Sequence, residues 1–278
     1  MLQKYDKLLA TTALAVAALA GSAMADAAGD LPACDLSDGY ASSAAGFSAQ
    51  LESCLADEST TVHRGDVEAN VLALTQRYRS RLGIDQLQTR ASLDQAAQAH
   101  ALDMAARSYA AHEDLEGRSH LHRVRTLDRS VLIGSAGANI AAGELGAGPD
   151  AFGALTADPV NRANLSRDAF SHVGIGAAEA VNGTVYVVQL FAQIDGELDA
   201  PLPASFSSTA DLDASFVDTG FEHVGWSLTD ETGRLLDRGY GERVTATLGA
   251  AQSAFINIDV ARHGGDTYSL KGPRITGQ

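Results

Sequence analysis

The sequence predicts an α+β protein in which helices cover a β-sheet, and three stretches support this. Asn182-Gly183 lies between two apolar runs, and this pair favours a β-hairpin because both residues tolerate a positive φ. Residues 66–83 and 92–108 carry apolar side chains at helical spacing, which predicts two long helices. Short alternating stretches after residue 220 predict further strands, so a small all-β domain should follow the hairpin.

The ends of the two long helices can be predicted from capping residues. Asp66 is expected as the N-cap of the first helix and Gly83 as its C-cap, while Ser92 should cap the second. The second helix is rich in alanine, so it can pack closely against a neighbour. Gly174 and Gly176, in the strand before the hairpin, are expected where another backbone approaches.

Three shorter elements are expected between the long helices and the hairpin. Residues 121–128 predict a third helix, and residues 137–144 predict a short apolar strand or turn between glycines. Pro149 suits the first turn of a last helix. Asp158-Pro159 should end that helix, because the residue before a proline avoids helical backbone angles.

The first 25 residues have the pattern of a cleaved signal peptide. Lys4 and Lys7 precede the apolar run 8–20, and small residues at 23–25 form a cleavage site. The alternative is a membrane anchor, but a run of about 13 residues falls short of the ~20 needed to span a bilayer. No later segment is apolar enough to cross a membrane. We therefore expect export to the periplasm or the extracellular space.

The two cysteines both follow the predicted cleavage site. In an exported chain, Cys34 and Cys54 are expected to form a disulfide that closes a short N-terminal loop, with two separate buried thiols as the alternative. Neither case supports a thiol nucleophile or a zinc site. The predicted division of the chain is residues 1–25 as signal peptide, 26–65 as N-terminal extension, 66–198 as main domain and 199–278 as β-rich C-terminal domain.

Charge and motif searches exclude several functions. The formal net charge of −15 repels nucleic acid and anionic lipid surfaces, so neither is an expected partner. The chain has no nucleophile elbow, phosphate-binding glycine loop, zinc-protease helix motif or dinucleotide fingerprint.

Seven short motifs in the middle of the chain occur in a specific order. They are Gln76-x-x-Arg79, Ala97-x-x-His100, Tyr109-x-x-His112, Gly137-x-Asn139-Ile140-Ala141, Pro159-x-x-Arg162-Ala163-Asn164, Phe170-x-x-Val173-Gly174-Ile175-Gly176 and Tyr186-Val187-Val188-Gln189-x-Phe191. Each motif is weak alone, but together they resemble the CAP superfamily of cysteine-rich secretory, antigen 5 and pathogenesis-related 1 proteins, in its bacterial secreted, SCP-like form. The resemblance covers about residues 66–194 and implies a three-layer α-β-α sandwich with a shallow cavity.

The resemblance also implies a cavity lined by two histidines and two acidic residues, which can hold a divalent metal or polarise a water. In this sequence His112 matches the first histidine. Ala138 stands at a glutamate position and Asn161 at the second histidine, and neither is a good metal ligand or proton carrier. Glu144 is a candidate replacement acid, with a solvated loop residue as the alternative. We therefore expect His112, Asn161 and Glu144 to line a degenerate cavity without a cofactor, a divalent metal at His112 being the weaker alternative.

The remaining histidines are expected to be structural. His100 lies on an apolar helix and should be a satisfied core histidine. His120 and His122 are two residues apart in a predicted helix, so they should point to different faces rather than share a metal.

In the C-terminal part, residues 196–207 predict a linker and residues 221–240 a hairpin that turns at 230–233. Trp226 and Tyr240 are either an exposed adhesive surface or the fill of a small core, and we favour the core.

These features favour an exported, non-catalytic binding or interaction module. Its partner would be a small amphipathic ligand, an envelope component or another protein. The alternative is a secreted metal-assisted hydrolase or protease that uses His112 and Glu144. A third hypothesis gives the function to the C-terminal strands, with the main domain as their scaffold. The sequence makes no prediction of the oligomeric state.

Overall fold

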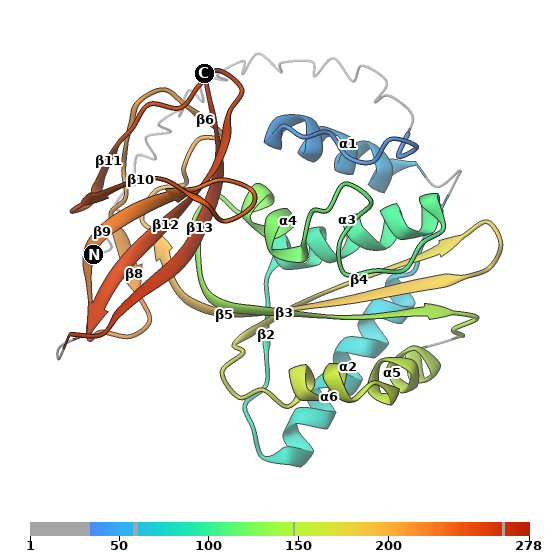
Figure 1. The fold of residues 1–278 in the computed structure, drawn as a ribbon. Coiled ribbons are helices and arrows are strands. Elements are labelled where there is room, and N and C mark those ends of the chain that lie inside the picture. Colours follow the sequence, from blue (N-terminus) through green and yellow to red (C-terminus); the bar gives the residue numbers. More distant parts are fainter. Residues whose placement is uncertain (1–33, 58–60, 147, 263–264) are drawn as a thin grey trace, which may run out of the picture. The chain divides into compact units, whose positions relative to one another are not determined.

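An eleven-stranded sheet organises the chain, with helices on both faces of its larger part (Figure 1). The structure is a computed structural model and describes residues 34–57, 61–146, 148–262 and 265–278. The predicted signal peptide, residues 1–25, lies outside the described residues. Within the described ranges, no helix has the length and apolar character that a membrane span requires.

Helices and strands are both abundant, which confirms the predicted α+β class. The helices are α1 (Ala44–Ala56), α2 (Gly65–Leu82), α3 (Ala91–Arg107), α4 (His120–Leu127), α5 (Gly148–Ala157) and α6 (Pro159–Leu165). The strands of the large sheet are β1 (Thr61–His63), β2 (Gln88–Thr89), β3 (Val131–Gly143), β4 (His172–Ala180), β5 (Val185–Leu198), β6 (Ser205–Phe206), β8 (Ala214–Phe216), β9 (Phe221–Thr229), β10 (Leu235–Tyr240), β12 (Ser253–Arg262) and β13 (Thr267–Gly277). A separate pair is formed by β7 (Thr209–Asp211) and β11 (Arg243–Thr245).

The predicted hairpin is confirmed and lies at the centre of the fold. Strands β4 and β5 pair in antiparallel fashion, and Gly183 takes a φ of 83° in the turn between them. The strand order β1-β4-β5-β3-β13-β12-β9-β10 places β3 on the other side of β5. The prediction of a short strand at 137–144 was wrong about its length. Strand β3 starts at Val131, and helices on both faces of the sheet contact it, so its small residues show no alternating pattern.

The caps of the two long helices differ from the prediction. The N-cap of α2 is Arg64, not Asp66, and Asp66 lies in the first turn, where its carboxylate accepts from the Arg64 guanidinium at 2.8 Å. An acidic residue there is favourable, because the helix dipole is positive at its N-terminus. Gly83 ends α2 with a φ of 72°, as predicted. Helix α3 already begins at Ala91, so the expected cap at Ser92 was wrong.

The Asp158-Pro159 pair has a second role that the prediction missed. It ends α5, as expected, and it also starts α6, because the Asp158 side chain caps the new helix and Pro159 is its first residue. Proline lacks the backbone N–H that an interior helical position needs, but the first turn does not use that donor.

The helices form two layers, one on each face of the sheet (Figure 1). Helices α1, α3 and α4 pack on what we call the α3 face, and α2, α5 and α6 pack on the α2 face, each over its own apolar cluster. The close approach predicted at Gly176 is confirmed, since a Cβ there would stand 2.2 Å from the backbone nitrogen of Gln98 in α3.

The N-terminal extension is tied to the α3 face. Cys34 and Cys54 form the predicted disulfide. Between them, Phe47 and Leu51 of α1 are 1% and 3% exposed, and they join the apolar cluster that contains α3. The extension therefore covers a helix layer of the main domain.

The C-terminal strands continue the large sheet. Lys271 in β13 pairs with Ile133 in β3, and β6 also pairs with β13, so residues 196–207 hold strand residues as well as the expected linker. The hairpin of β9 and β10 forms as predicted. Trp226 is 4% exposed and fills the core of this part, whereas Tyr240 is 95% exposed, so the favoured core assignment is right for Trp226 and wrong for Tyr240. That residues 199–278 form a separate domain stays a prediction.

Candidate functional site

The three residues expected to line the cavity come from different layers. His112 is exposed in the loop 108–119 between α3 and α4, on the α3 face. Glu144 is exposed just after β3, and Asn161 is 5% exposed in α6, on the α2 face (Figure 1). Among the described residues, no hydrogen bond or ion pair joins these three side chains. Their assignment to one cavity stays a prediction.

Ala138, which the resemblance predicts at the position of a family glutamate, is a buried residue. Ala138 is 7% exposed and belongs to the apolar cluster of the α3 face. Its neighbour Asn139 is fully buried and is bonded to α6 on the opposite face, because successive residues of a strand point to opposite sides.

Three motif residues form a chain of buried amides on the α2 face. Asn139 Nδ2 donates to the Asn161 carbonyl and to Gln189 Oε1, both at 3.1 Å. Asn164 Nδ2 donates to Asn139 Oδ1 at 2.9 Å, and Gln189 Nε2 donates to Thr75 Oγ1 at 2.8 Å. The chain links α2, α6, β3 and β5. These motif residues therefore hold the fold together, and their polar atoms are occupied by one another.

Arg79, the arginine of the first motif, acts in the same way. Its side chain is fully buried, and within the described ranges its guanidinium donates only to backbone carbonyls. The acceptors are the carbonyls of Asp85, Leu165, Arg167 and Phe170. Arg79 thus fixes the end of α6 and the segment that leads to β4.

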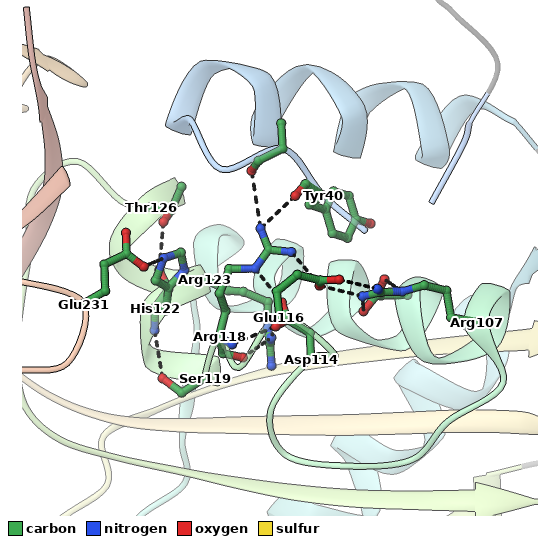
Figure 2. A network of polar contacts seen from close by, with 12 residues as sticks. Tyr40, Arg107, Asp114, Glu116, Arg118, Ser119, His122, Arg123, Thr126 and Glu231 are labelled. Carbon is green, nitrogen blue, oxygen red and sulfur yellow. Dashed lines mark hydrogen bonds and ion pairs between the residues drawn. The ribbon is translucent and has the colours of Figure 1, made fainter. Parts of the chain in front are cut away.

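On the α3 face, buried charges hold the loop that carries His112 (Figure 2). Arg118 Nε donates to Asp114 Oδ2 at 2.7 Å, and its Nη1 donates to the Tyr40 carbonyl of the N-terminal extension at 2.8 Å. Arg123 in α4 donates to the carbonyls of Arg118 and His112, at 2.8 and 3.2 Å. The loop backbone is thus fixed while the His112 side chain stays exposed.

A buried histidine, His100, and a half-buried one, His120, lie near His112 and Arg123. Burial, together with the charge of Arg123, lowers the pKa of His100 to about 3 and that of His120 to about 4, and His112 adds to both shifts. Both imidazoles are therefore neutral at neutral pH. His100 Nε2 lies 2.7 Å from the Ala111 carbonyl, but its Nδ1 has no partner among the described residues. His100 is thus a core histidine, as predicted, but only half satisfied.

The proximity of His120 to His112 could not be predicted from the sequence. The two are eight residues apart across an irregular loop, and no periodic pattern connects them. His122, by contrast, turns away as predicted, and its Nε2 lies 3.1 Å from Glu231 in the β9–β10 turn (Figure 2). In the described part of the chain, no group of three or more His, Cys, Asp or Glu side chains has the spacing of a metal site.

One comparison with known proteins agrees with the motifs. The profile of the CAP family, described as the cysteine-rich secretory protein family, matches residues 72–191. Two similar solved structures are an outer surface protein from Borrelia burgdorferi (17% identity, TM-score 0.42, 47% of this chain and 94% of that one) and an extracellular SCP-domain protein from Bacillus anthracis (24% identity, TM-score 0.41, 48% and 41%). A search of curated proteins gives no match. The stretch that matches this family profile, residues 72–191, contains all seven motifs.

Proposed function

We propose that this protein is an exported CAP-domain module that binds a ligand or partner without catalysis at the family cavity. Ala138 carries this proposal. A methyl group in the apolar cluster of the α3 face stands where the family has a carboxylate, and it can neither bind a metal nor move a proton. The partner would be a small amphipathic ligand, an envelope component or another protein.

The chemistry around His112 also supports a site without a cofactor. Arg123 brings a positive charge among His100, His112 and His120, and this charge adds to desolvation in lowering the pKa of His100 and of His120. A divalent cation favours carboxylates and imidazoles that no guanidinium opposes. The residues present therefore do not fit a divalent metal.

The alternative, a hydrolase that uses His112 and Glu144, has less support. A general base must lie within hydrogen-bond reach of the group it serves. His112 follows α3 on one face of the sheet, while Glu144 follows β3 and leads into α5 on the other face (Figure 1). No specific contact in the described residues favours this pair.

Export is part of the proposal and rests on two observations. The first is the signal-peptide pattern of residues 1–25. The second is the Cys34–Cys54 disulfide, since such bonds persist in oxidising compartments outside the cytosol. Detection of the mature chain in the periplasm or medium, with its N-terminus near residue 26, would test the export step.

Calorimetry with zinc and calcium tests the absence of a metal site. The mature protein is compared with His112→Ala and with His63→Ala, which removes an exposed histidine from β1 as a matched control. We expect no binding heat that depends on His112. Micromolar binding that disappears in the His112 variant and persists in the His63 variant would overturn the proposal.

A further inference from the structure

A cavity of about 400 Å³ lies outside the family motifs. It is bounded by the α3–α4 loop, α4, the β9–β10 turn and one residue of β12. Its lining includes Arg118, Leu121, His122, Arg125, Glu231 and Phe255. Its volume is in the usual range for small-molecule sites. The cavity therefore joins the CAP domain to the C-terminal strands.

Arg125 is the unusual residue of this cavity. It is 6% exposed, and its Nη2 donates to the Ile256 carbonyl at 2.7 Å and to Asn257 Oδ1 at 2.8 Å. Its Nε donates to the Gly272 carbonyl, and the guanidinium lies 4.3 Å from the centre of the Phe255 ring. All of these acceptors are neutral. A buried guanidinium without an anion is costly, because burial removes the water that solvates its charge.

Three other arginines in this part of the fold do not share this property. Arg107, Arg118 and Arg274 each form an ion pair with a carboxylate. Arg125 has no ion pair among the described residues, and burial lowers its pKa to about 9. Lys271 is close enough for the charge of Arg125 to lower its pKa, after the larger effect of burial. The cavity thus borders a positive centre that lacks a counter-ion.

The acidic residues of the lining do not supply this counter-ion, because most are already paired. Glu116 pairs with Arg107 and Arg118, Asp230 with Arg234, and Glu231 with His122 and Arg274. They still add negative charge around the cavity, as does Glu113 in its lining. A ligand with one negative charge therefore fits better than one with two.

We propose that this cavity binds a small organic carboxylate whose apolar body packs against Phe255 and Leu121. Its carboxylate would accept from Nη1 of Arg125, the guanidinium nitrogen that has no acceptor among the described residues. The site goes beyond the proposed function, because its lining includes none of the motif residues and does not depend on His112.

Calorimetry on the mature, full-length protein with benzoate tests the site. Benzoate carries one carboxylate on an apolar ring, while benzyl alcohol and inorganic phosphate serve as the neutral and multiply charged probes. We expect saturable benzoate binding and at least about tenfold weaker binding of both other probes. Benzyl alcohol lacks the negative charge that strengthens a hydrogen bond to the guanidinium. Phosphate lacks the apolar ring and brings more than one negative charge near the acidic lining.

Three variants locate the binding. Arg125→Gln removes the charge, and Thr232→Trp fills the cavity from the exposed β9–β10 turn, so each should weaken benzoate about tenfold or more. Arg129→Gln is the control, because Arg129 bonds the backbone carbonyls of Leu202, Pro203 and Arg274 and does not line the cavity. If Arg125→Gln fails to fold, the benzoate affinity of Thr232→Trp decides whether benzoate binds in this cavity.

Unchanged benzoate affinity in Thr232→Trp, no saturable benzoate binding to the wild type, or tighter binding of phosphate would each overturn the proposal. These results would leave the test of His112 unaffected, because no variant here touches that residue or uses a metal.

Discussion

The two faces of the sheet differ in how they satisfy buried polar groups. On the α2 face, Arg79 and the amide chain of Asn139, Asn164 and Gln189 find acceptors in one another and in the backbone. On the α3 face, five buried atoms have no partner among the described residues: Tyr40 Oη, His100 Nδ1, His120 Nδ1, His122 Nδ1 and Arg123 Nε. A satisfied network rigidifies a core, whereas an unsatisfied one costs free energy. Stability should therefore depend most on the α2 face, and pH sensitivity on the α3 face.

The largest effect is expected from replacing a buried arginine on each face. Arg79→Met leaves four carbonyls without their donor, and we expect it to lower the free energy of unfolding by about 3–5 kcal/mol. Arg123→Met removes two such bonds, but it also removes a cation that opposes His100 and His120, so a loss of about 1–3 kcal/mol is expected. Urea unfolding of both variants measures the difference. Equal losses in the free energy of unfolding would mean that the buried arginines of the two faces contribute equally to stability.

Lowering the pH should destabilise the protein through the two histidines of the α3 face, His100 and His120. The pKa of His100 is about 3 in the fold and about 6.5 in an unfolded chain, so the unfolded state binds the proton first. Stability should fall as the pH drops from about 6.5 toward 3, by roughly 2–3 kcal/mol at pH 4.5 from His100 alone. His120 adds a loss in the same direction, down to its pKa of about 4. Urea unfolding at a series of pH values measures this slope.

Two variants show which histidine causes this pH dependence of stability. His100→Gln removes one titrating group and should flatten it, while His63→Gln, at an exposed position on β1, should leave it unchanged. A wild-type protein whose stability is constant between pH 6.5 and 4.5 would show that His100 and His120 are not held neutral.

Local patterns predicted the elements whose signals are local. The Asn182-Gly183 hairpin, the Gly83 cap and the close approach at Gly176 each follow from backbone freedom at one or two residues. The Cys34–Cys54 pair follows from the compartment and the residue count. The length of β3 could not be predicted, because a strand contacted by helices on both faces and rich in Gly and Ala has no alternation.

Long-range contacts account for the parts that the sequence did not reveal. The pairing of Lys271 with Ile133, which continues the sheet into the C-terminal strands, joins residues far apart in the chain. The motifs led to the prediction that Ala138 and Asn161 stand at positions of the family site, and it stays a prediction. They could not show that His120 approaches His112, nor that Arg125 is buried without a counter-ion, because both depend on how loops and strands pack.

The smallest effect comes from adding one methyl group on each face. A Cβ at Gly176 would lie 2.2 Å from the backbone nitrogen of Gln98, so Gly176→Ala must displace α3 and should cost about 1–3 kcal/mol. At Gly137 the nearest atoms are side-chain atoms of Asn164 and Phe170, both at 3.0 Å, and these can shift. Gly137→Ala should therefore cost less than about 1 kcal/mol. Urea midpoints compare the two variants, and a larger loss at Gly137 would show that the amide chain of the α2 face is the more tightly packed contact.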